Sequence, residues 1–77
     1  MTTAWVVYNH GDQTAAEAGY VVGAFGSSAL ALIAAQGVLL EDTGCSPADI
    51  EMEHYSGMSD LTVGDYWVRV TSHGVVA

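Results

Sequence analysis

The chain has 77 residues, 51% of them hydrophobic, and a formal net charge of −8 at pH 7. This length predicts one domain over residues 1–77, and the hydrophobic content is too high for a disordered chain. Nine acidic residues are accompanied by one basic residue, Arg69. Contact with nucleic-acid phosphates or with an anionic membrane surface requires Lys and Arg, so the composition excludes direct nucleic acid binding and membrane binding.

The cysteine content and the N-terminus bear on the cellular compartment. The single cysteine, Cys45, allows neither a disulfide within the chain nor a cysteine-based metal site, which indicates a reducing compartment. The N-terminal sequence MTTAWVV lacks the basic region of a signal peptide. The apolar run 29–40 is shorter than the roughly 20 residues that span a bilayer. We therefore expect a cytoplasmic protein.

Four segments have the composition of β-strands. Residues 5–8 and 19–25 are rich in aromatic and β-branched side chains. Residues 49–55 alternate between apolar and polar side chains, as do residues 65–72. Residues 56–60, the sequence SGMSD, are predicted to form a loop between the last two strands. On this alternation, the covered face of the sheet includes Ile50, Met52, Tyr66, Val68 and Val70.

A helix is predicted between the second and third strands, over residues 28–42. Ser27 and Ser28 supply N-cap side chains, and Gly44 is placed to end the helix. The order is β-β-α-β-β. We expect a two-layer α+β domain in which one helix covers one face of a four-stranded antiparallel sheet.

Part of the chain resembles a group of small phage and actinobacterial proteins of unknown function. These proteins begin with a strand similar to WVVYNHG and continue with a VVGxFxS strand end and an alanine-rich helix. The corresponding residues here are 5–11, 21–28 and the helix that follows, so the resemblance covers residues 5–40. It implies a phage or prophage origin and no established activity. Unlike the helices of that group, this helix has no charged residue before Glu41.

The predicted helix has apolar residues on both of its sides. At 100° per residue, Leu32, Leu39 and Leu40 lie on one side, together with Ala35 and Gln36. We assign this side to the sheet because Glu41 projects from the opposite side of the helix, and an unpaired carboxylate is costly to bury. Ile33 lies on the border and also contributes to the sheet side. The opposite side remains uncovered. Together with the border residue Ile33, it forms an apolar patch of Leu30, Ile33, Ala34, Gly37 and Val38.

An uncovered apolar patch of this kind predicts a protein interface. Its simplest cover is the same helix of a second copy, crossing about a twofold axis, because small residues allow two backbones to approach closely. Two alternatives to an interface remain open. In the first, the alanine-rich helix tolerates the exposure of this patch. In the second, the chain covers the patch with its own tail, Val75 and Val76, or with the loop 9–18.

The residues that could perform chemistry are few and scattered. The densest clusters of metal-ligating side chains are His10 with Asp12, and Glu51 with Glu53 and His54. On a strand, Glu51 and Glu53 point to the face opposite His54, so this segment cannot converge on a metal. The motifs of hydrolase nucleophiles and phosphate-binding loops are missing from the sequence. We therefore expect no enzyme activity, no catalytic residue, no cofactor and no metal.

The remaining class is a small non-enzymatic protein of phage type that acts through protein–protein interaction. It is expected to form a homodimer through its apolar helix, and a host protein is a further possible partner. The alternative is an acidic decoy that imitates DNA and inhibits a nucleic-acid-binding host protein. The alternative requires carboxylates in rows on one face, whereas most of the negative charge is explained by solubility.

Overall fold

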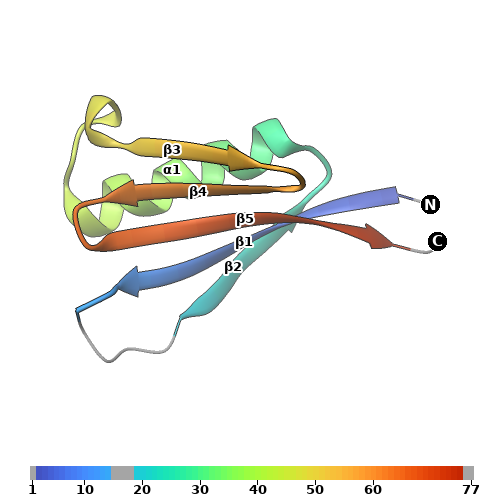
Figure 1. The fold of residues 1–77 in the computed structure, drawn as a ribbon, viewed down its shortest axis with the longest axis horizontal. Helices are drawn as coiled ribbons and strands as arrows, with labels where there is room; N and C mark the ends of the chain where they lie inside the picture. Colours follow the sequence, from blue (N-terminus) through green and yellow to red (C-terminus); the bar gives the residue numbers. More distant parts are fainter. Residues whose placement is uncertain (1, 15–18, 76–77) are drawn as a thin grey trace.

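The computed structural model describes residues 2–14 and 19–75, which form one antiparallel sheet with a helix on one face (Figure 1). The sheet has five strands in the order β2-β1-β5-β4-β3. Every neighbouring pair of strands is antiparallel. The elements are β1 (Thr2–Asp12), β2 (Tyr20–Phe25), α1 (Ser28–Thr43), the 3-10 helix η1 (Pro47–Asp49), β3 (Glu51–Tyr55), β4 (Met58–Val63) and β5 (Tyr66–Val75).

The α+β prediction is confirmed, but the predicted four-stranded sheet is wrong by one strand. The segment 56–60 is not a loop, because only Ser56 and Gly57 form the turn and β4 begins directly after them. Gly57 has a φ of 71°, a conformation that glycine adopts without strain and that permits so short a connection. Beyond the turn, Ser59 and Leu61 are buried at alternate positions, as a strand requires.

Both ends of α1 follow from the local sequence. The Ser27 hydroxyl accepts a hydrogen bond from the Leu30 amide at 3.2 Å, which satisfies one of the free amides of the first turn. At the other end, Gly44 adopts the left-handed conformation with φ 67°, and its amide donates to the Leu40 carbonyl. The predicted caps are therefore confirmed, and the helix extends one residue beyond the predicted range of 28–42 to Thr43.

The core lies between α1 and the covered face of the sheet. Its fully buried sheet residues are Val7, Leu61, Val68 and Val70, and α1 contributes Ala31, Ala35 and Leu39. The predicted covered-face residues Ile50, Met52 and Tyr66 pack around this core, partly buried.

The side of α1 that faces the sheet differs from the predicted one. Leu39 is buried as expected, but Ala31 and Ala35 complete the buried line at a spacing of four residues. Leu32 only borders the core, and Ile33 points away from it, with 66% of its surface exposed. The small side chains of Ala31 and Ala35 let α1 approach the sheet closely.

Candidate protein interface

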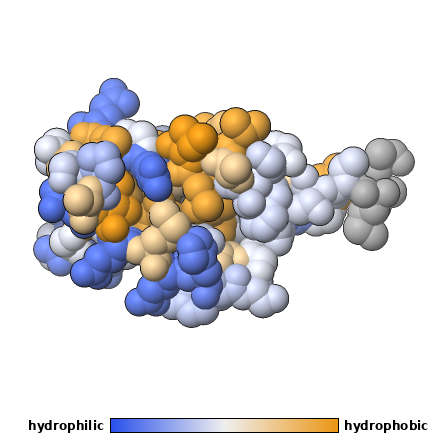
Figure 2. Space-filling model, turned by 90° about the horizontal axis from the view of Figure 1, so that it is seen from above, coloured by the Kyte–Doolittle hydropathy of each residue, from blue (hydrophilic) through white to orange (hydrophobic). Residues whose placement is uncertain are grey.

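The outer face of α1 is apolar and uncovered. We define it by its exposed residues Ala29, Leu30, Ile33 and Gly37. Leu30 exposes 55% of its surface and Ile33 exposes 66%, although both are large aliphatic side chains. Viewed from above, hydrophobic surface gathers over the side of the molecule on which α1 lies (Figure 2). No charged residue interrupts the helix between Ser28 and Leu40.

The five residues predicted for the interface do not share one environment. Leu30, Ile33 and Gly37 are exposed, whereas Ala34 and Val38 are partly buried and pack against the core. Ala34 and Val38 therefore flank the outer face, and its centre is shifted toward Ile33. The shift follows from the inward line of Ala31, Ala35 and Leu39, which turns Ile33 directly to the opposite side.

Gly37 lies within this apolar face without a role in the packing of its own chain. A Cβ built at Gly37 meets nothing within 4 Å. Gly19 shows the contrast, because a Cβ there meets the Asn9 carbonyl oxygen at 2.6 Å and the Tyr8 ring at 2.5 Å. A glycine in a helix interior costs about 1 kcal/mol relative to alanine. Within residues 2–14 and 19–75, no contact beside Gly37 compensates for that cost.

The tail considered as a cover for the helix lies elsewhere. Val75 ends β5, pairs with Thr2 and is 44% exposed. Asn9 to Asp12 belong to β1 and not to a loop. Val76 and residues 15–18 lie outside the described residues. Within residues 2–14 and 19–75, the segments proposed as covers therefore leave the outer face of α1 open.

The open face of the sheet, which faces away from α1, carries an interlocked cluster of aromatic and charged side chains. The rings of His10 and Trp67 stack with centroids 3.6 Å apart, and Tyr8 lies tilted against His10 at 4.6 Å. The Arg69 guanidinium lies over the Trp67 ring at 5.0 Å. Arg69 also pairs with Asp60, its Nε lying 2.7 Å from Oδ1. We call these five residues the open-face cluster.

The electrostatics of the cluster follow from these contacts. Partial burial and the nearby Arg69 charge lower the pKa of His10 below its usual value, because both disfavour the protonated, positively charged form of the His10 ring. The hydrogen bond to Asp60 raises the pKa of Arg69. The stacking of His10 was not predicted, because a bulge between Asn9 and Gly11 places His10 beside Trp67.

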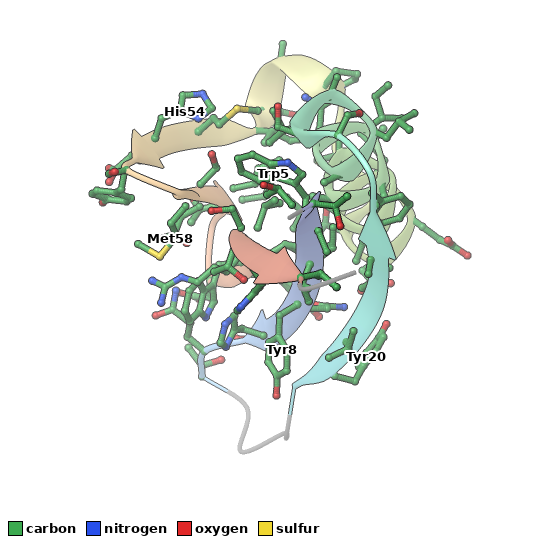
Figure 3. All side chains as sticks on the ribbon, turned by 90° about the vertical axis from the view of Figure 1, so that its right-hand side faces the viewer. Trp5, Tyr8, Tyr20, His54 and Met58 are labelled. Atoms are coloured by element: carbon green, nitrogen blue, oxygen red, sulfur yellow. The ribbon has the colours of Figure 1, made fainter. Side chains whose placement is uncertain are left out.

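The other aromatic residues divide between the two faces. Trp5 is directed toward the α1 side, and Met58 is directed away from it (Figure 3). Tyr55 lies on the open face, and its hydroxyl donates to Glu53, which raises the pKa of Tyr55. Most large aromatic groups therefore have partners within the chain.

The described residues do not assemble a metal site. No group of three or more His, Cys, Asp or Glu side chains converges within residues 2–14 and 19–75. His10 stacks on Trp67, and His54 forms a 2.8 Å contact between Nδ1 and the Ser59 hydroxyl on the covered face. Glu53 lies opposite Asp60 on the other face. The divergence of His54 from Glu51 and Glu53 follows the predicted strand parity.

Negative charge gathers at one end of the molecule. This end contains the C-terminus of α1, η1, the start of β3 and the turn between β4 and β5 (Figure 1). The pairing of Asp12 with Tyr66 brings the end of β1 to the same place. The carboxylates located here are Asp12, Glu41, Asp42, Asp49, Glu51 and Asp65. Hydrophilic surface is dense at the left of Figure 2, which is this end.

No protein-family model, curated protein or solved structure matches the chain. Among the described residues, no helix has both the length and the hydropathy needed to cross a membrane.

Proposed function

We propose that this is a non-enzymatic protein that acts through protein–protein contact and self-associates through the outer face of α1. The observation that supports this most strongly is Gly37, a helix-interior glycine with open space beside it and exposed Leu30 and Ile33 as neighbours. A second helix that approaches closely at Gly37 explains why a larger residue is not used there.

The spacing along α1 suits an antiparallel pair of helices. Ile33 and Gly37 are one helical turn apart on the same face. A twofold axis that passes between them places Ile33 of each copy against Gly37 of the other copy. The most exposed aliphatic side chain of α1 then fills the smallest position. Leu30 of one copy lies near Leu40 of the other in the same arrangement, since both are equally distant from the axis.

The charges of α1 favour the antiparallel pair over a parallel one. Glu41 and Asp42 lie at the C-terminal end of the helix, and the first turn contains no acidic residue. An antiparallel pair keeps the two acidic ends apart and brings each Glu41 toward the helix N-terminus of the other copy, where the dipole is positive. A parallel pair would bring the two acidic ends together and raise the electrostatic repulsion.

The size of this face sets the expected affinity. The 16-residue helix is about 24 Å long and about 10 Å wide. Such a face is smaller than the about 800 Å² per partner that stable complexes bury. We therefore expect a reversible dimer with a dissociation constant of about 10⁻⁶ to 10⁻⁴ M.

Substitution of Gly37 tests the proposal, because its two expected effects have opposite signs. Gly37→Ala should stabilise the monomer by up to about 1 kcal/mol, measured by urea unfolding of dilute protein. The same variant should weaken self-association at least about tenfold, because the added methyl group separates the helices. Gly37→Glu should abolish self-association. Sedimentation velocity over a range of protein concentrations measures the self-association of both variants.

Ala48→Glu is the matched control, since it adds the same charge at an exposed position of η1. This variant should associate like the wild type. A wild-type protein that sediments as a monomer up to about 10⁻³ M, above the expected range, contradicts the proposal. Equal association of wild type and Gly37→Ala also contradicts it.

The distribution of charge gives the acidic decoy less support. A DNA mimic requires rows of carboxylates along a face, but six of the eight described carboxylates gather at one end of a molecule 37 Å long. Of the carboxylates in the middle of the open face, Asp60 is paired with Arg69. A decoy's binding to its target would weaken steeply with salt and would be indifferent to Gly37→Glu, so the same variant separates the two functions.

A further inference from the structure

The two edges of the sheet differ in how well they are protected against a further strand. Unprotected edges present rows of free amide and carbonyl groups, and natural proteins usually block them with charges. At one edge, β3 carries the exposed carboxylates Glu51 and Glu53. At the other edge, β2 has the sequence YVVGAF and carries no charge. Only a bulge between β1 and β2, near Val22, interrupts its regular pairing.

The β2 edge also exposes large side chains. Tyr20 and Val21 expose 58% and 59% of their surfaces. Val21 pairs with Tyr8 on the open face, whereas Tyr20 pairs with Asn9 on the covered face. Figure 3 shows Tyr20 at the margin of the sheet. The edge therefore offers main-chain hydrogen bonds together with one apolar contact on each face of the sheet.

A carboxylate is fixed at the Tyr20 end of this edge. The Asn9 side-chain amide donates to the Tyr20 hydroxyl and to the Asp42 carboxylate, each at 3.2 Å. Asn9 is itself buried, with 4% of its surface exposed, and its side-chain oxygen accepts from the Gly11 amide at 2.8 Å. Asp42 lies in the last turn of α1, which contains no basic residue. The negative end of the helix dipole adds to this charge.

We propose that the β2 edge binds an extended segment of another protein, antiparallel to β2, with Lys or Arg at the C-terminal end of that segment. The antiparallel sense is chosen because antiparallel pairing is slightly more stable per residue than parallel pairing. Because β2 runs from Tyr20 to Phe25, the C-terminal end of the bound segment lies beside Tyr20. A basic side chain there meets Asp42, and an apolar one contacts Val21.

Charge complementarity favours another protein over a second copy of this chain as the occupant. An antiparallel β2 from a second copy would place Phe25 and the residues after it near Asp42, and none of these is basic. The only cation of the whole chain, Arg69, is paired with Asp60 in the middle of the sheet. This site is independent of the proposed self-association, since it uses the sheet edge and not the outer face of α1.

Two blocked synthetic peptides test the proposal. One alternates Thr and Val over the length of β2 and ends in two lysines, and the other has the same composition with the lysines first. Titration followed by amide chemical shifts gives both affinities, and hydrogen exchange locates the protected amides. The lysine-last peptide should bind about fivefold more tightly, as expected for one surface ion pair. The new protection should fall on β2.

Three variants sharpen the result. Asp42→Asn should remove the preference for the lysine-last peptide, whereas Glu51→Gln, the same charge change at the other edge, should retain it. Val21→Lys should weaken both peptides at least about tenfold, because it places a cation on the edge without touching the contacts of Asn9. Gly37→Glu should bind both peptides like the wild type, which separates this site from the proposed dimer.

Protection on β3, equal affinities of the two peptides, or no binding at about millimolar peptide, the weak end of specific binding, overturns the proposal.

Discussion

The two faces of the sheet are built on different physical principles. On the covered face, Val7, Leu61, Val68 and Val70 are withdrawn from water by α1. On the open face, none of the described helices and strands covers the open-face cluster, which consists of contacts between neighbouring side chains. Exclusion of water stabilises the first face, and this contribution is neither screened by salt nor altered by the titration of a side chain. Stacking and ion pairing stabilise the second, so its contribution depends on solution conditions.

The largest effect is expected from emptying the covered face. Leu39→Ala removes the largest side chain that α1 places in the core, and we expect a loss of about 3 kcal/mol in the free energy of unfolding. Urea unfolding measures the loss. Leu30→Ala, the same substitution on the exposed side of the helix, should change it by less than about 0.5 kcal/mol in dilute protein. Equal losses in the two variants would contradict the assignment of the two helix sides.

A smaller loss is expected from the centre of the open-face cluster. Trp67→Ala removes the stacking partner of His10 and the ring beneath Arg69, so we expect a loss of about 1–2 kcal/mol in the free energy of unfolding. Urea unfolding measures this loss as well. Trp67→Phe retains a ring and should recover about half of it. If Trp67→Ala is as stable as the wild type, the stacking contacts contribute nothing to the fold.

The difference between the two faces also explains what sequence analysis could predict. Alternation of side chains correctly placed Val68 and Val70 on the covered face. Successive side chains of a strand point to opposite faces, so a strand with one buried face shows an apolar residue at every second position. The caps Ser27 and Gly44 were also predicted correctly, because each forms a hydrogen bond with a backbone group only a few residues away in the sequence. Features that depend on nearest neighbours in the chain were therefore predictable.

Features that depend on contacts between distant segments were not. β4 was missed because Ser59 and Asp60 resemble loop residues, although Ser59 is buried beside His54 and Asp60 pairs with Arg69. The inward side of α1 was misjudged because leucine volume alone does not reveal how closely the helix approaches the sheet. His10 stacks on Trp67 because of a bulge in β1. The only sequence feature that hints at this bulge is Gly11, which by itself does not identify the partner of His10.

The ion pair on the open face should contribute less than Trp67. Arg69 and Asp60 form two hydrogen bonds, of 2.7 and 3.1 Å, but the arginine remains 35% exposed. A double-mutant cycle with Arg69→Gln and Asp60→Asn should give a coupling free energy of about 0.5–1 kcal/mol at low salt. The coupling should shrink at about 1 M salt, where screening is strong. A coupling independent of salt would place the pair in a less hydrated environment than the open face provides.

The smallest effect is a dependence of stability on pH that arises from His10. Burial and the Arg69 charge lower the pKa of His10 in the folded protein from its usual value of 6.5. The unfolded chain therefore binds the proton more readily, and the free energy of unfolding must fall as the pH decreases from 6.5 toward the lowered pKa. The stability contribution is complete above pH 6.5.

His10→Gln should remove this slope, and the difference between its unfolding free energy and that of the wild type isolates the contribution of His10 from those of the other titrating groups. Arg69→Gln should reduce the slope without abolishing it, because burial is the larger cause of the lowered pKa. An NMR titration of the His10 ring should show a midpoint below 6.5 in the wild type. A midpoint at or above 6.5 would mean that a carboxylate, and not Arg69, dominates the field at His10, since Asp60 is the neighbour that opposes the shift.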